Sequence, residues 1–231
     1  MLNKGIEDSV ASTFISNLQL WCMDQNIDDL FFDMNGSDRN VNADTMFSVC
    51  DRFFLVEMKS KESNIKDEAA KPAVCVLCTG LKDHWKLRTL HRACHYIMWG
   101  QINQPHLRLE TYYSVYENAV CRPEVLPDCP SVTKAPKQII LPGLHLTSLI
   151  AKGEGGLTGN YFFPYLAWLL GNRSGPFVPF TPKNNIPIAL VGNSFNRRVI
   201  GKLFESYDEL NNWGEEALLN KLKGDRSASH P

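Results

Sequence analysis

The segment FFLVEMKS at residues 53–60 constrains the fold of this chain more than any other. Its first four residues are apolar on both faces of an extended chain, as in a central strand that is covered on both sides. Polarity enters only at Glu57 and Lys59. Two charges in an apolar strand are costly unless they are paired or bound to a metal ion. The pattern is compatible with a functional pair on a central strand and with a solvated pair on an edge strand.

Two further strands are expected before this segment, at residues 30–35 and 43–49. Turn residues separate the three short segments, which is typical of an antiparallel meander. The order of elements therefore predicts that these strands are neighbours in one sheet.

The turn at residues 50–52 sets the expected register of the second and third strands. If the turn is centred on the last two of these residues, Asp44 lies opposite Lys59. In the same register Met46 lies opposite Glu57. Directly opposed residues share a face of the sheet, and so do residues two apart on one strand. Asp44 and Glu57 would then be diagonal neighbours, about 7–8 Å apart, and could converge on one divalent cation.

Helical periodicity is expected over residues 5–24 and over residues 82–99. The charged residues 61–71 are expected to form a solvated loop. Residues 73–79 fit a strand or a helix, whereas residues 107–116 are rich in aromatic and β-branched residues and are expected to form a strand. The chain is thus expected to be an α/β protein, with a mixed sheet flanked by helices.

Prolines divide the chain into parts. We expect a core over residues 1–120, a proline-rich connection over residues 121–143 and a C-terminal α/β extension over residues 144–224 that packs on the core. Residues 225–231 are expected to be a disordered tail.

Within the extension, residues 153–159 (GEGGLTG) are rich in glycine. They lack the Gly-Lys-Ser/Thr ending of a phosphate loop, so a flexible loop before a helix is favoured. A helix is expected near residues 160–170, a strand near residues 186–191 and a last helix near residues 207–222.

The composition limits the functions that are open to the chain. The formal net charge of −1 argues against the basic surface of a stand-alone nucleic-acid binder. A role with nucleic acid would need a local patch, bound cations or a partner subunit. No apolar run approaches the ~20 residues of a membrane span, and the N-terminus lacks the apolar core of a signal peptide. We therefore expect a cytoplasmic protein without a membrane partner.

Seven cysteines at irregular spacing argue against a disulfide framework. Most are expected to be buried and apolar. Cys75 and Cys78 could join His91 and His95 in a zinc site, although the cysteine segment has the character of a core element.

The segment ADTMFSV-CDR-FFLVEMKSK, an acid on one strand followed by Glu-x-Lys on the next, resembles the PD-(D/E)XK nuclease superfamily. The resemblance covers about residues 5–118. It implies a restriction-endonuclease-like core with the order α-β-β-β-α-β. Ala43 stands where the proline that gives the family its name would be.

The resemblance implies a role for each residue of the motif. Asp44 and Glu57 would bind Mg²⁺ or Mn²⁺ with the backbone carbonyl of Met58, and Lys59 would position or activate the attacking water. Glu7 is the nearest candidate for the acid that many members carry on the first helix. Hard oxygen ligands of this kind suit Mg²⁺.

The second expected helix carries a basic face that includes Arg88 and Arg92. Together with Lys82, these residues are candidates for phosphate contacts. A solvated face without a ligand fits the same pattern.

The expected function is divalent-metal-dependent hydrolysis of phosphodiester bonds, with DNA as the favoured substrate, within a restriction or phage-defence assembly. A partner subunit or a second copy of the chain could supply binding surface. The alternative is a non-catalytic nucleic-acid-binding or scaffold subunit that keeps the nuclease fold.

Overall fold

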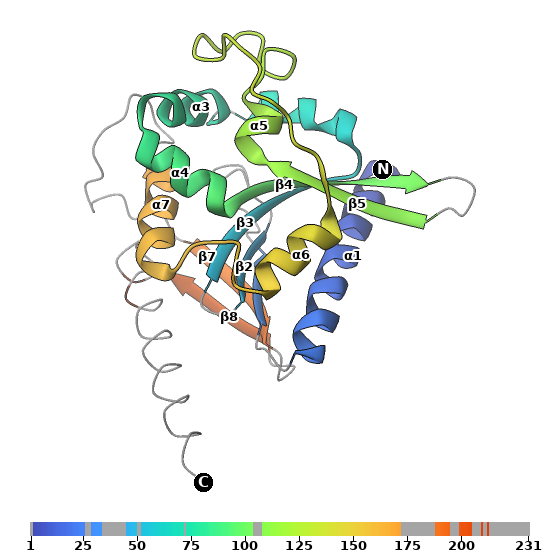
Figure 1. The fold of residues 1–231 in the computed structure, drawn as a ribbon. Coiled ribbons are helices and arrows are strands. Elements are labelled where there is room, and N and C mark those ends of the chain that lie inside the picture. The colour runs from blue at the N-terminus through green and yellow to red at the C-terminus, as the bar shows by residue number, and fades with distance from the viewer. Residues whose placement is uncertain are drawn as a thin grey trace.

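In a computed structural model of the chain, Glu57 and Lys59 lie on strand β3 inside a sheet of eight strands (Figure 1). Across the sheet the strands follow the order β6-β5-β4-β3-β2-β1-β7-β8. The structure describes residues 2–25, 29–33, 45–49, 52–71, 73–103, 108–171, 188–194 and 199–204, together with residues 209 and 212.

The strands are β1 (Asp29–Asp33), β2 (Thr45–Val49), β3 (Arg52–Lys59), β4 (His95–Asn103), β5 (Arg108–Val115), β6 (Leu141–Pro142), β7 (Ile188–Ser194) and β8 (Val199–Phe204). The helices are α1 (Leu2–Asp24), the 3₁₀ helix η1 (Glu62–Ala70), α3 (Val74–Asp83), α4 (Trp85–Cys94), α5 (Tyr116–Val120), α6 (Gly143–Ala151) and α7 (Gly159–Gly171).

The sheet is mixed, as expected for the α/β class. β1, β2 and β3 form an antiparallel meander, and β4 returns parallel to β3 after the helices between them. β5 pairs antiparallel with β4, and β7 pairs antiparallel with β1. β3 therefore has a paired strand on each side and is buried from Phe53 to Lys59, as its apolar run predicted.

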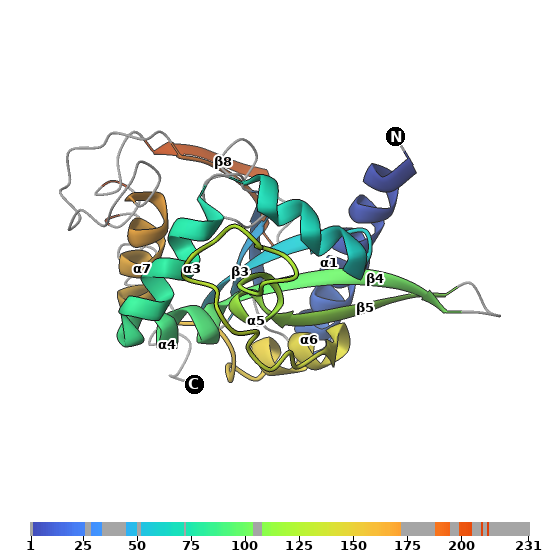
Figure 2. The ribbon, with the colours of Figure 1, turned by 90° about the horizontal axis from the view of Figure 1, so that it is seen from above.

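Helices cover both faces of the sheet (Figures 1 and 2). A Cβ on Gly100 of β4 would meet the side chain of Val10, which places α1 on that face. The ring of Phe53 stacks on Phe162 of α7 with centroids 5.4 Å apart, which places α7 on the opposite face. Because side chains alternate along a strand, Glu57 and Lys59 project to the same face as Phe53.

The helix that was expected over residues 82–99 is shorter in the structure. α3 and α4 break at His84, α4 ends at Cys94, and β4 begins at His95. The error has a physical cause, because a strand that is buried on both faces is a continuous apolar run and lacks the alternation that marks other strands. The strand expected at residues 107–116 is present as β5, and it is the second strand after the helices.

The prediction of a solvated loop over residues 61–71 was wrong in part. Residues 62–70 form the 3₁₀ helix η1, and most of this segment is exposed, but Ile65 and Glu68 are buried. A charged segment was expected to be exposed because isolated charges resist burial. Here the charges of Glu68 and Lys71 meet opposite charges on β3.

The glycine-rich loop is anchored to β3. Phe53 and Leu157 exchange backbone hydrogen bonds of 2.7 and 2.9 Å, and the amide of Gly156 donates to the carbonyl of Ala93. Gly156 has φ +77°, and a Cβ there would lie 2.9 Å from the carbonyl oxygen of Phe53. Glycine is therefore required at this position for both its backbone angle and its close packing.

Four cysteines form two disulfides, which corrects the expectation of buried, unpaired thiols. Cys75 pairs with Cys129, and Cys78 pairs with Cys121. The two cysteines of the first bridge lie 54 residues apart in the chain, and those of the second lie 43 apart. Local spacing could therefore not indicate the pairing. Both bridges fasten the proline-rich connection to α3. Disulfides are rare in the cytosol, so the bridged state and the expected cytoplasmic location are in tension.

No helix in the described part of the chain has both the length and the apolar character to cross a bilayer. The helix expected near residues 207–222 and the tail at residues 225–231 lie almost entirely outside the described residues. The strand expected near residues 186–191 is present as β7.

We predict that the two bridges stabilise the fold. Closing loops of this length is worth about 4 kcal/mol each when only chain entropy is counted. A reducing agent should therefore lower the melting temperature by about 20 °C, as measured by differential scanning fluorimetry. A variant with serine at all four positions should show no response to the reducing agent. Alkylation of all four thiols in the unreduced protein would contradict the pairing.

Candidate ion-pair site on β3

Glu57 and Lys59 form one half of a buried cluster of charges. They lie two residues apart on β3 and share a face of the sheet. Their relative exposures are 1% and 8%. The Nζ atom of Lys59 donates a hydrogen bond of 2.6 Å to Oε1 of Glu57. The expectation of two paired charges in a covered strand agrees with this geometry, and the edge-strand alternative does not.

η1 supplies the other half of the cluster. Lys71, which follows η1, places its Nζ atom 2.5 Å from Oε1 of Glu57 and 3.0 Å from Oε1 of Glu68. Lys59 also reaches Oε1 of Glu68, at 2.8 Å. Each ammonium group therefore lies between the same two carboxylates, and the cluster carries equal numbers of positive and negative charges.

A tyrosine of α5 also binds the carboxylate of Glu68. The hydroxyl of Tyr116, at the first residue of α5, donates to Oε2 of Glu68. Tyr116 is fully buried. Burial, followed by the nearby carboxylates of Glu68 and Glu57, raises the pKa of Tyr116 well above its usual value. The hydroxyl therefore keeps its proton and acts as a fixed donor.

The charges within the cluster stabilise one another. Burial alone would raise the pKa of Glu68, but the ammonium groups of Lys71 and Lys59 outweigh it and lower this pKa to about 2. Burial alone would lower the pKa values of Lys59 and Lys71, but the carboxylates of Glu57 and Glu68 raise both instead. All three groups are therefore ionised across the neutral range.

The register of β2 and β3 differs from the expected one. Thr45 pairs with Val56 and Met46 pairs with Leu55, so Met46 is not opposite Glu57. Each described residue of β2 therefore pairs with a residue of β3 that lies two positions earlier in the chain than expected. A shift of two preserves the alternation of faces. Asp44, the expected metal ligand on β2, lies outside the described residues.

The other two expected metal ligands do not join the cluster through their side chains. Glu7 lies on α1, and α1 covers the face of the sheet opposite to Glu57. Met58 lies between the two charged residues of β3 and pairs with Met98 of β4. Its side chain therefore points away from the cluster, and only its backbone belongs to the same stretch of strand.

The expected phosphate contacts lie on the far side of α5. Arg88 and Arg92 of α4 both pair with Glu117, and their shortest distances to it are 2.5 and 2.9 Å. Each arginine keeps more than 40% of its side chain exposed. Lys82 lies at the end of α3 and is exposed. Lys82 and Arg88 line a surface pocket, and Arg92 pairs with Glu117 of the same pocket. None of the three forms an ion pair with the β3 cluster.

The structure does not bring together the residues of the zinc alternative. Cys75 and Cys78 are in the disulfides, whereas Nδ1 of His91 and Nδ1 of His95 each lie 2.7 Å from the hydroxyl of Tyr165. Burial lowers the pKa of His91. Within the part of the chain that the structure describes, no group of three or more His, Cys, Asp or Glu side chains could hold a metal ion.

Sequence reasoning missed Glu68 and Lys71 because their segment is polar throughout. The available signal was weak. The two residues are three apart, which places them on one side of a helical turn. A segment of mixed charge directly after Glu-x-Lys could have suggested that the pair on β3 finds its partners there.

We predict that Glu68→Gln destabilises the protein in a pH-dependent way. The folded pKa of about 2 lies below the ordinary 4.5, so the ionised group contributes stability above pH 4.5, and this contribution is lost as the pH falls toward 2. At neutral pH the loss in the variant should be on the order of 3 kcal/mol. The difference from wild type should shrink toward pH 2, as measured by urea unfolding.

Glu62→Gln is the matched control, because Glu62 is an exposed carboxylate on the same helix. It should leave the free energy of unfolding unchanged at each pH. A deficit in Glu68→Gln that stays constant from pH 7 to pH 3 would show that the loss does not come from the ionised carboxylate.

Comparison of the chain with protein-family models, with curated proteins and with solved structures found no match. No family is therefore assigned by similarity. The chemistry of the candidate site follows from the buried residues of β3 and η1.

Proposed function

We propose that the chain is a divalent-metal-dependent nuclease whose reaction centre is the charge cluster on β3, with DNA as the expected substrate. The observation that carries the proposal is the convergence of two buried carboxylates, Glu57 and Glu68, beside Lys59 at the end of a central strand. Sites with perturbed charges held in a protein interior are often functional.

The order of the elements supports the same proposal. α1, three antiparallel strands, helices and a parallel β4 follow one another as the resemblance to the PD-(D/E)XK superfamily implies. Glu57 and Lys59 occupy the Glu-x-Lys positions on the third strand. A restriction-endonuclease-like core is thus part of the proposal, as is a role within a restriction or phage-defence assembly.

The donor set fits Mg²⁺ or Mn²⁺. Carboxylate oxygens are the ligands that such hard cations prefer, and Mg²⁺ is commonly held by one or two carboxylates together with substrate and water. The space between Glu57 and Glu68 already favours positive charge, because two ammonium groups lie there. Glu57 and Glu68 would hold the ion, and Asp44 stays a third candidate. A bound divalent ion would supply Lewis-acid polarisation of a phosphate group.

The lysines have different roles in this proposal. Both lysines contact Glu57 and Glu68, but Lys59 has the smaller exposure of the two, so in this proposal it would stay in the site and offset negative charge on a phosphate. Lys71 is more exposed, at 15%, and it would be the lysine that gives up its position between the carboxylates to a bound cation. Tyr116 keeps Glu68 in place through its hydrogen bond.

One observation favours the alternative of a non-catalytic subunit. The exposures of Glu57 and Glu68 are 1% and 0%, and their ion pairs with two lysines balance their charge. A buried network of ion pairs can hold η1 on the sheet without any reaction. The nuclease proposal predicts DNA cleavage and metal binding, whereas the non-catalytic alternative predicts neither.

We predict that the purified protein cleaves plasmid DNA in Mg²⁺ or Mn²⁺ and that Lys59→Met and Glu57→Gln each lower the rate by about 100-fold or more, as loss of one electrostatic group commonly does. Gel electrophoresis of the products measures the rate. Lys61→Met, which removes an exposed lysine two residues away, should keep full activity. Circular dichroism must show that each variant is folded.

If the folded wild-type protein cleaves neither DNA nor RNA with either metal, alone or with partner subunits, the nuclease proposal fails. The same result would favour the non-catalytic subunit. Activity that survives both Lys59→Met and Glu57→Gln would place the reaction elsewhere in the chain.

We further predict that Lys71→Met binds Mn²⁺ more tightly than the wild-type protein does. Removing one ammonium group leaves two carboxylates with a single lysine, which lowers the repulsion toward a divalent cation. Isothermal titration calorimetry should show an affinity at least about tenfold higher, whereas Glu57→Gln should lose binding. Equal affinities in Lys71→Met and the wild type would mean that no cation enters between these carboxylates.

A further inference from the structure

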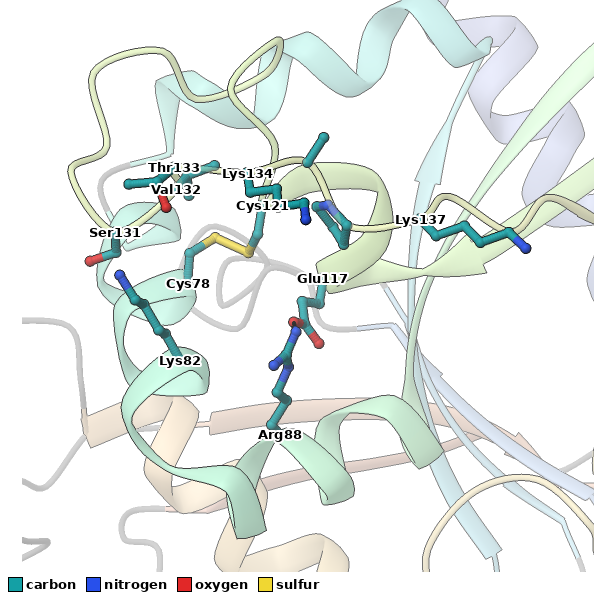
Figure 3. A pocket seen from close by; sticks show the side chains of 12 residues that line it. Cys78, Lys82, Arg88, Glu117, Cys121, Ser131, Val132, Thr133, Lys134 and Lys137 are labelled. Carbon is teal, nitrogen blue, oxygen red and sulfur yellow. Dashed lines mark hydrogen bonds and ion pairs between the residues drawn. A yellow bond between two sulfur atoms is a disulfide. The ribbon is translucent and has the colours of Figure 1, made fainter.

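A pocket of about 600 Å³ lies between α3, α4, α5 and the proline-rich connection (Figure 3). This volume is in the usual range for ligand sites, about 300–1,000 Å³. The disulfide between Cys78 and Cys121 forms part of its wall and fixes the connection to α3. The pocket is therefore a feature of the bridged fold.

The lining of the pocket is strongly basic. Four of its residues are cationic and one is acidic: Lys82, Arg88, Lys134, Lys137 and Glu117. Glu117 forms ion pairs with both Arg88 and Arg92, so its negative charge is already compensated. Within the described residues the three lysines form no ion pair with a carboxylate. An excess of positive charge therefore remains for a ligand.

The cations are spread along the pocket. In Figure 3, Lys82 and Lys134 stand on different walls, and Lys137 extends away from both along the connection. A single small anion would need its donors gathered at one point. Donors spread along a path suit a ligand with successive negative charges, such as a phosphodiester chain.

Hydroxyl groups and a neighbouring aromatic ring add to this pattern. Ser131 and Thr133 line the pocket, and the hydroxyl of Ser131 lies 2.7 Å from that of Thr79. Trp85 lies outside the lining of the pocket and begins α4 with 71% of its surface exposed, and Nζ of Lys86 lies 5.8 Å from the centroid of its ring. Trp85 precedes Arg88 by three residues, so the two lie on the same side of the helix. Exposed aromatic rings beside cations are the usual platform for unpaired bases.

We propose that this pocket binds the phosphate groups of single-stranded nucleic acid, with a base stacked on Trp85. A flexible strand can lower its phosphates into a hollow of this size, whereas the phosphates of a rigid duplex would reach only the rim. The overall charge of −1 does not oppose this binding, because the positive charge is concentrated locally.

The pocket is separate from the charge cluster on β3. Tyr116 contacts the cluster, whereas Glu117, the next residue of α5, faces the pocket. The proposal concerns binding and does not require cleavage. It can be tested without a divalent metal, so its failure is distinct from failure of the nuclease proposal.

The test is fluorescence anisotropy with a labelled dT oligonucleotide of about 12 nucleotides, within the site sizes of single-strand binders, in EDTA. The wild-type protein should bind it. Lys134→Glu/Lys137→Glu should weaken binding by about tenfold or more. It should also reduce the salt dependence of the affinity, by about 0.7 in logarithmic slope for each phosphate that the variant no longer neutralises. Trp85→Leu should weaken binding by about fivefold or more.

Lys66→Glu/Lys152→Glu is the matched control, because it makes the same change in charge at two exposed lysines outside the pocket. It should bind as the wild type does, and any comparable weakening would overturn the assignment to the pocket. Binding of a duplex of equal length with equal affinity would also overturn the proposal. So would displacement of the oligonucleotide by pyrophosphate at concentrations close to the protein's, because that result would assign the pocket to a free phosphate compound.

Discussion

The contact between β3 and η1 through four alternating charges is the interaction on which the rest of the structure depends. Glu57 and Lys59 enter the interior on a strand with neighbours on both sides, and they could not stay there without opposite charges from outside the sheet. η1 and the residue after it supply those charges, and η1 is thereby fixed over the sheet. Removing one partner of such a network leaves an uncompensated charge in a poorly solvating interior. The proposed metal site uses the two carboxylates of the same network.

Features that depend on local pattern could be predicted from the sequence. Val10, Phe14 and Leu18 recur at helical spacing, and all three are buried in α1. The apolar run before Glu57 predicted a covered strand, and β3 has that environment. In both cases the residues that carry the pattern are also the residues that pack, so periodicity alone was sufficient.

Features that depend on contacts distant in the chain could not be predicted. The cysteine pairs join residues that local spacing does not connect, and the burial of Glu68 depends on its ion pair with Lys59 of β3. The residues from His95 to Trp99 follow a helix and have no alternation, so their assignment depended on whether a neighbouring strand was present. Their pairing with β3 makes them a strand. In the charge cluster, Glu57 and Lys59 could be predicted from the sequence, whereas Glu68 and Lys71 could not.

The adjacency of Tyr116 and Glu117 has a mechanical consequence. One residue is tied to the interior network, and the other is tied to two arginines at the surface. α5 has only five residues. Through two neighbouring residues, this short helix therefore joins the ion pairs at the surface to the hydrogen bond that holds the buried carboxylate of Glu68.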